Sequence, residues 1–212
     1  MRITVFGATG GTGVEVVRQA LAAGHEVTAV VRDPARLPAE LRERAEVVQA
    51  DVMDPEAIRP AVAGRDAVIS ALGPRGRGPT TICTDGIRSI AAACEAAGVR
   101  RVLMVSASGL AADAGDGAVT RYVVKPMILQ RLLRHAFADM SEAESVLGGT
   151  KLDWTVVRPP RLLDKPGKGT YRRALDLNVR RGFQIPRADV ATALLDHVQD
   201  QGSVRHIVTI AT

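Results

Sequence analysis

The chain has 212 residues, of which 46% are hydrophobic and only 3% aromatic, and its net charge is +5 from 28 basic and 23 acidic side chains. That length suits one domain with a sizeable core of small aliphatic residues. The basic residues are scattered and few aromatic rings could stack on bases, so we expect no nucleic-acid partner. No apolar run reaches membrane-spanning length, and the N-terminus is typical of a strand rather than a signal peptide, so we expect a cytoplasmic protein without a membrane partner.

The first thirteen residues predict a strand, a glycine-rich turn and the start of a helix. Residues 2–6 form a short apolar run that suits a buried parallel strand, and Gly7, Gly10 and Gly13 follow at three-residue spacing. This order of elements can bind a pyrophosphate, because glycine lets the backbone approach a ligand and a helix N-terminus offers free N–H groups. Thr9 and Thr12 add hydroxyl donors there. The alternative is a glycine-rich turn that only joins the strand to the helix.

Strands and helices alternate along the rest of the chain. We predict strands at 2–6, 26–31, 46–49, 67–70, 101–105, 153–157 and 205–210, and helices at 12–23, 35–43, 55–62, 80–97, 127–147 and 187–199. Right-handed crossovers then give an α/β single-domain Rossmann fold, a doubly wound parallel sheet of order 3-2-1-4-5-6 plus a late strand. Residues 1–110 would form the cofactor half and residues 111–212 a small substrate-side elaboration of the same domain, 1–212.

The end of the second predicted strand indicates which dinucleotide is bound. An NAD site usually carries an acid here for the ribose 2′-hydroxyl, but this chain has Arg32, with Arg36 one helical turn later. Two guanidinium groups suit a 2′-phosphate, so we predict that NADP(H) is preferred over NAD(H). The alternative is that Arg32 pairs with Asp33 or a surface acid and that Asp33 holds the ribose.

Polar and small residues follow three later strands. Asp51 could cap the next helix or accept from an adenine amino group, and the small Ala71 and Gly73 would let their loop pass close to the cofactor. Ser106 and Ser108 would face the nicotinamide or the substrate, or they cap a turn.

The two cysteines and four histidines show no metal-ligand spacing and no disulfide framework, so we expect no metal. Cys94 lies in an alanine-rich helix and is expected in the core; an exposed Cys83 would be open to regulation.

Several motifs together resemble the atypical short-chain dehydrogenases/reductases with an NAD(P)H-binding, NmrA-like Rossmann domain, and most of all the flavin reductase/biliverdin reductase B group. They are Gly7-Ala-Thr-Gly-Gly-Thr-Gly13, Val31-Arg-Asp-Pro34, Gln49-Ala-Asp-Val52, Asp66-Ala-Val-Ile69, Val105-Ser106 and Arg158-Pro-Pro160. The resemblance implies a pyrophosphate site at Gly7, Thr9, Gly10, Gly11, Thr12 and Gly13, and a 2′-phosphate site at Arg32 and Arg36. It also implies cofactor contacts at Asp51, Val52, Leu72, Gly73, Arg75, Ser106 and Pro160.

Two departures from the family pattern bear on the reaction. Tyr122 and Lys125 are three residues apart and Pro126 follows, so they do not form the Tyr-x-x-x-Lys pair of standard short-chain dehydrogenases. Arg161 stands where the flavin and biliverdin reductases carry a histidine, and an arginine could bind an anionic substrate group but not donate a proton.

These features predict an NADPH-dependent reductase that transfers hydride to a planar conjugated acceptor such as a flavin, a quinone or a bilin, with Ser106 and Ser108 orienting the acceptor. One alternative is a non-catalytic NADP(H)-binding redox sensor of NmrA type, and a weaker one is an epimerase or dehydratase. We expect a monomer or weak homodimer whose partner is a small-molecule acceptor.

Overall fold

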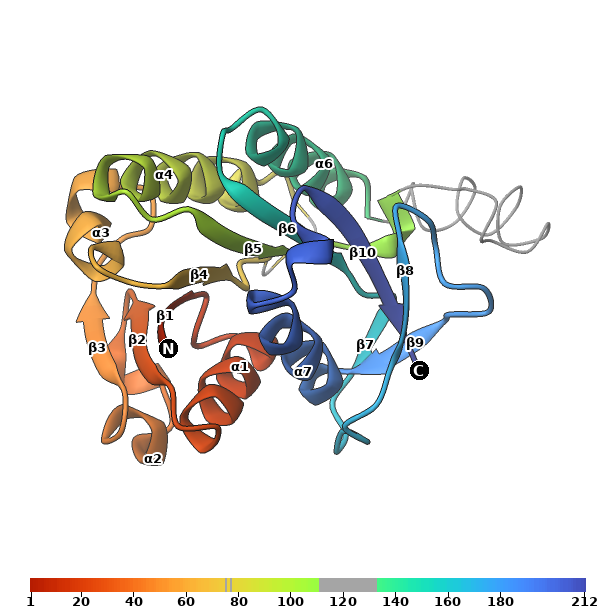
Figure 1. The fold of residues 1–212 in the computed structure, drawn as a ribbon, viewed down its shortest axis with the longest axis horizontal. Coiled ribbons are helices and arrows are strands. Elements are labelled where there is room, and N and C mark those ends of the chain that lie inside the picture. Colours follow the sequence, from red (N-terminus) through yellow and green to blue (C-terminus); the bar gives the residue numbers. More distant parts are fainter. Residues whose placement is uncertain (75, 77, 111–132) are drawn as a thin grey trace.

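The computed structural model of the protein describes residues 1–74, 76, 78–110 and 133–212. Its centre is a sheet of eight strands within these residues, in the order β3-β2-β1-β4-β5-β6-β10-β8 (Figure 1). The strands are β1 (Arg2–Phe6), β2 (Glu26–Val31), β3 (Glu46–Gln49), β4 (Ala67–Ser70), β5 (Arg101–Val105), β6 (Asp153–Arg158), β8 (Arg172–Leu175) and β10 (His206–Ala211). The predicted Rossmann order with a late strand is confirmed, and the strand directions are parallel except for β8, which runs antiparallel to β10.

Helices cover both faces of the sheet (Figure 1). On one face lie α1 (Gly11–Ala22) and α7 (Arg187–Val198), and on the other lie α3 (Pro55–Val62), α4 (Ile82–Ala97) and α6 (Arg134–Gly148). Each face has its own apolar core, one beneath α1 and α7 and one beneath α3, α4 and α6. The central strands β1, β4 and β5 are rich in apolar residues because both of their faces are buried, whereas the edge strands β3 and β8 are partly exposed.

Two stretches differ from the predicted elements. The helix predicted at 35–43 is broken into a 3-10 turn, η1 (Pro34–Arg36), and a short helix, α2 (Ala39–Arg42). The break falls at Leu37 because the proline ring of Pro38 disfavours helical backbone in the residue before it. Of the helix predicted at 127–147, residues 127–132 lie outside the described part of the chain.

Three short strands in the C-terminal part were not predicted. These are β8 at the sheet edge and a separate parallel pair, β7 (Arg161–Leu163) and β9 (Gln184–Pro186). Each has only three or four residues, too few to show a period of two. The chain leaves the main sheet after the Pro159-Pro160 pair, because proline cannot continue a central strand, and β7 pairs outside that sheet.

Candidate nucleotide-binding site

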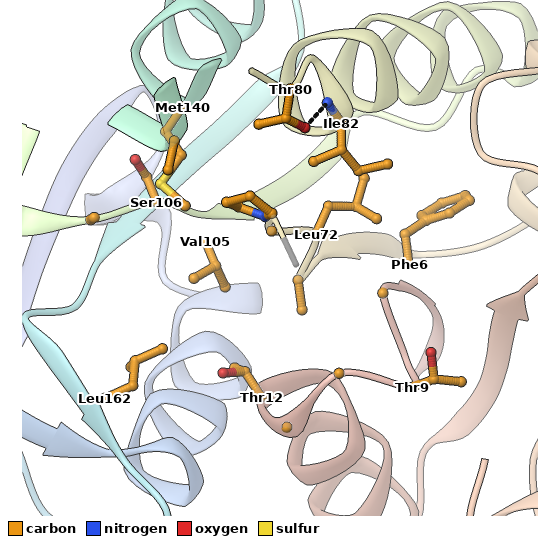
Figure 2. A pocket seen from close by; sticks show the side chains of 18 of the residues that line it. Phe6, Thr9, Thr12, Leu72, Thr80, Ile82, Val105, Ser106, Met140 and Leu162 are labelled. Atoms are coloured by element: carbon orange, nitrogen blue, oxygen red, sulfur yellow. Dashed lines mark hydrogen bonds between the residues drawn. The ribbon is translucent and has the colours of Figure 1, made fainter. Parts of the chain in front are cut away.

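A cavity of about 690 Å³ opens at the carboxyl ends of the central parallel strands. It lies where the strand order reverses between β1 and β4, the usual ligand position in open α/β sheets. Figure 2 shows Phe6 and Thr9 on one side of it, Ser106, Met140 and Leu162 on the other, and Leu72 between them. The cavity therefore has a side next to the glycine-rich turn and a side next to α6 and β7.

The glycine-rich turn is packed so tightly that side chains are excluded. Gly7 has φ +74°, and a Cβ on it would lie 2.6 Å from the carbonyl oxygen of Ala71. A Cβ on Gly13 would lie 2.2 Å from the carbonyl oxygen of Gly7. Helix α1 begins at Gly11 with no side-chain cap and no acidic residue in its first turn. The N-terminus of α1 therefore presents the positive end of the helix dipole to the cavity, and no acidic side chain in the first turn of α1 neutralises it.

The two arginines after β2 lie at the same end. Thr9, Arg32, Asp33 and Arg36 line a further hollow of about 300 Å³ beside the main cavity. Neither arginine forms an ion pair with any residue that the structure describes. The carboxylate of Asp33 instead accepts from the backbone N–H of Ala35 at 3.0 Å and caps η1. The alternative pairing of Arg32 with Asp33 is not observed, and both guanidinium groups are exposed for a phosphate.

An apolar slot continues from this hollow toward α4. It is lined by Phe6, Val30, Ala50, Val52, Leu72 and Ile82. Asp51 does not line the slot: its carboxylate accepts from the backbone N–H of Met53 at 3.1 Å. The cap of α3 is Asp54, which accepts from two backbone N–H groups, so the interpretation of Asp51 as the helix cap is wrong.

The loop after β4 crosses the middle of the cavity. Ala71, Leu72 and Gly73 line it. The backbone N–H of Ala71 donates to the carbonyl of Phe6 at 3.0 Å, which ties this loop to the end of β1. Arg75 lies outside the described residues.

Of the two serines after β5, only Ser106 lines the cavity. Its side chain is 4% exposed, and its Oγ has no hydrogen-bond partner within the described part of the chain. Ser108 is also buried but lies off the cavity, with its backbone N–H donating to the carbonyl of Pro159. A buried hydroxyl in a cavity wall without a partner is satisfied when a ligand supplies one.

Three residues after β6 reach the cavity. Pro159, Pro160 and Leu162 line it, whereas Arg161 is exposed and does not. Within β7 neighbouring side chains point to opposite faces, which separates Arg161 from Leu162. The predicted contact of Arg161 with substrate is therefore not seen in the cavity wall.

The wall on the far side of the cavity comes from α6, and the sequence did not predict it. It is formed by Leu133, Ala136, Phe137 and Met140. On the same helix the carboxylate of Asp139, 5% exposed, accepts from the backbone N–H groups of Cys83 at 2.9 Å and Thr84 at 2.8 Å. Thr81, at the N-terminus of α4, makes no side-chain cap, so Asp139 caps α4 from another helix and fixes α6 beside the cavity.

Charge in the cavity is positive. Among its described lining residues only Arg32 and Arg187 have ionisable side chains, and neither can donate a proton near neutral pH. Arg187 was not among the predicted site residues, although it begins the stretch Arg187-Ala-Asp-Val190, for which only the start of a late helix is predicted. Tyr122 and Lys125 lie outside the described residues.

The cysteines lie away from this chemistry. Both are buried, and burial raises the pKa of the Cys83 and Cys94 thiols to about 12, so neither is a thiolate near neutral pH. No cluster of three or more histidine, cysteine or acidic side chains in the described ranges could hold a metal ion. No helix among the described residues is long and apolar enough to cross a membrane.

Residues 7–201 match a protein family described as NAD(P)H-binding, and the chain belongs to that family. It is 28% identical over 209 residues to the uncharacterized sugar epimerase YhfK of Bacillus subtilis, covering 96% of this chain and 90% of that one. Its fold matches a short-chain dehydrogenase/reductase from Veillonella parvula in complex with NADP, at TM-score 0.82 and 22% identity over 100% of this chain and 94% of that one. It also matches ChuY, an anaerobilin reductase from Escherichia coli O157:H7, at TM-score 0.80 and 23% identity over 100% and 97% of the two chains. The predicted NAD(P)H-binding family is thereby confirmed, and the resemblance to short-chain dehydrogenases/reductases is confirmed for the fold.

Proposed function

We propose that the protein is an NADPH-dependent reductase whose acceptor is planar and conjugated, such as a flavin, a quinone or a bilin. The observation that carries the proposal is the second half of the cavity, where Ser106 faces an apolar wall formed by Phe137, Met140 and Leu162. Apolar walls with one well-placed polar group suit a flat aromatic ligand. A conjugated acceptor can take its proton from water, so it requires a hydride but no acid from the protein.

The residues of the first half fit a dinucleotide. The glycine-rich turn lines the cavity at the uncapped N-terminus of α1, where a diphosphate would meet free backbone N–H groups, and Arg32 and Arg36 are exposed beside the hollow that a 2′-phosphate would fill. When bound, NADPH supplies the hydride. Ser106 would then donate a hydrogen bond to a carbonyl oxygen of the carboxamide or the acceptor.

The relatives support this assignment unequally. ChuY is described as a reductase of a bilin-type molecule, but its low identity supports the fold more than the substrate. The description of YhfK as a sugar epimerase points the other way. Epimerisation of a sugar requires a protein group that moves a proton to or from a carbon or hydroxyl of the sugar. The described lining residues offer only arginines as ionisable groups.

The test is a titration of the purified protein with NADPH and NADH, followed by NADPH oxidation with FMN, a quinone or biliverdin. The proposal expects selective NADPH binding and oxidation only when an acceptor is present. Selective binding without oxidation by any acceptor would instead favour a redox sensor. Tight retention of NAD+ through turnover of a nucleotide sugar would favour an epimerase.

A variant of the apolar wall sharpens the test. Phe137→Ala should raise the KM for the acceptor while leaving the Kd for NADPH within about twofold, because Phe137 lines the acceptor side only. Phe183→Ala is the matched control, since Phe183 is the most exposed large apolar side chain of the described residues and lines no part of the cavity. An equal loss of NADPH binding in Phe137→Ala would contradict the division of the cavity into two halves.

A further inference from the structure

Arg187 lies in an unusual place for a cation. It is the first residue of α7, yet its side chain lies across the N-terminus of α1: a Cβ on Gly11 would come within 2.8 Å of the Arg187 Cδ. Its Nη1 donates to Thr12 Oγ1 at 3.4 Å. A positive side chain beside the positive end of a helix is unfavourable unless negative charge is present.

The negative charge that the protein places next to Arg187 and the N-terminus of α1 offsets their positive charge only weakly. Helix α1 has no acidic residue in its first turn. The partner of Arg187 is Asp164, whose Oδ1 lies 2.6 Å from the Arg187 Nε, but the Asp164 side chain is 83% exposed. Ion pairs with so exposed a member are screened by water and contribute little. Arg187 and the N-terminus of α1 thus form a positively charged site, and an anion bound in the cavity would stabilise this arrangement.

We infer that Arg187 binds the diphosphate of the dinucleotide beside Gly11 and Thr12 at the N-terminus of α1, and that Asp164 is the counter-ion which the diphosphate replaces. The inference depends on dinucleotide binding by the family and not on the reductase reaction proposed above. A guanidinium group has five N–H donors, which suit two phosphate oxygens at once. Diphosphate recognition would then join the two ends of the sequence, 175 residues apart.

The backbone around Arg187 is held in place for this role. Gln19 of α1 donates to the carbonyl of Ala188 at 2.8 Å and accepts from the Thr192 hydroxyl at 2.9 Å, so α7 is fixed to α1. The segment that carries Asp164 is fixed separately, because the buried Asp189 carboxylate accepts from the backbone N–H groups of Lys168 and Gly169. Only side chains need to move when Arg187 exchanges Asp164 for a phosphate.

The experiment compares Arg187→Gln with Asp164→Asn by calorimetric titration of the full chain with NADPH and NADH. Arg187→Gln should weaken both nucleotides by the same factor, about tenfold or more, because both contain the diphosphate. Asp164→Asn should leave binding unchanged or tighten it about twofold, because it removes a competitor for the arginine. Arg187→Lys, which keeps the charge but not the planar donor pair, should fall between wild type and Arg187→Gln.

Inorganic pyrophosphate serves as a second probe that needs neither the nicotinamide nor an acceptor. It should compete with NADPH in wild type and much less in Arg187→Gln. A purely structural ion pair predicts something different: both variants would lower the melting temperature alike and change binding alike. Equal weakening by Asp164→Asn and Arg187→Gln, or binding within twofold of wild type in a folded Arg187→Gln, would overturn the inference.

Discussion

The two ends of the cavity are built in different ways. The end proposed to bind the diphosphate, the phosphate end, is made by consecutive residues, 7–13, where close backbone approaches leave no room for a Cβ on Gly7 or Gly13. The end proposed to bind the acceptor, the acceptor end, is made by residues on or next to β5, α6 and β7, which are far apart in the sequence. Changes at the first end should therefore act through backbone shape and abolish binding, and changes at the second end should act through side-chain position and alter binding by degrees.

Gly13→Ala should produce the largest effect. Its Cβ would lie 2.2 Å from the carbonyl oxygen of Gly7, and neither backbone segment can move without opening the turn. We expect the Kd for NADPH and for NADH to rise more than about 100-fold, and the free energy of unfolding to fall by about 1–3 kcal/mol. Nucleotide titration and thermal melting would measure both.

Gly148→Ala is the matched control, because a Cβ on Gly148 meets nothing within 4 Å and Gly148 does not line the cavity. It should bind both nucleotides within about threefold of wild type. Similar losses in the two variants would show that the turn at residues 7–13 is not held by close backbone approach.

Arg32→Ala should come next, with an effect on one nucleotide only. The exposed guanidinium of Arg32 forms no ion pair with a described residue, so its removal should weaken NADPH binding by about 10–100-fold and NADH binding by less than threefold. Arg42→Ala, an exposed arginine on the nearby α2 that lines neither hollow, is the control. Equal losses for NADPH and NADH would reduce Arg32 to a structural role.

The same contrast explains what could be predicted from the sequence. The seven main parallel strands and the phosphate end were predictable because buried apolar runs and glycine spacing are local signals. The wall from α6 depends on Asp139, which caps α4 across a separation of 55 residues. A contact between residues so far apart leaves no pattern in the local sequence, so it could not be predicted. Arg187 was missed for the same reason. Arg161 was assigned to the substrate because it stands where the flavin and biliverdin reductases carry a histidine, and the short strand β7 that turns it away from the cavity was not predicted.

Asp139→Ala tests whether the acceptor end depends on the side-chain contacts that hold α6 beside the cavity. It leaves the backbone N–H groups of Cys83 and Thr84 without their acceptor inside the protein, which should lower the free energy of unfolding by about 2–4 kcal/mol. Because α6 would shift, the KM for the acceptor should rise while the Kd for NADPH stays within about threefold. Thermal melting and acceptor kinetics give the two readouts.

Asp85→Ala is the control for Asp139→Ala, since Asp85 is an exposed acid in the first turn of the same α4. It should cost well under 1 kcal/mol and leave the acceptor KM unchanged. If Asp139→Ala weakened NADPH and acceptor equally, the two ends of the cavity would not be separable.

A buried histidine outside the cavity gives a smaller, pH-dependent effect on the fold alone. Burial lowers the pKa of His197, assisted by the charge of Arg173 and opposed by Asp200, whose Oδ2 lies 3.0 Å from Nδ1. Below the unfolded pKa of about 6.5, the unfolded chain binds a proton at His197 more readily than the folded chain does. The contribution of His197 to the free energy of unfolding is therefore fully present above that pH and falls as the pH drops below it. The slope from this group cannot exceed about 1.4 kcal/mol per pH unit.

Urea unfolding between pH 5 and pH 7.5 would measure that slope, and His197→Gln should remove it whatever its cost to stability at neutral pH. Nucleotide affinity per folded molecule should not follow the same curve, because His197 does not line the cavity. An unchanged slope in His197→Gln would assign the pH dependence to other groups.

Arg161→Ala should have the smallest effect. Arg161 is exposed and lies between two cavity-lining residues, Pro160 and Leu162, on the opposite face of β7. Its removal should change the acceptor KM by less than about threefold, whereas Leu162→Asp, one residue further on, should raise that KM about tenfold or more by placing a charge in the apolar wall. A tenfold rise in Arg161→Ala would mean that the acceptor extends beyond the cavity onto the outer face of β7, and that the acceptor end includes charge recognition as well as an apolar wall.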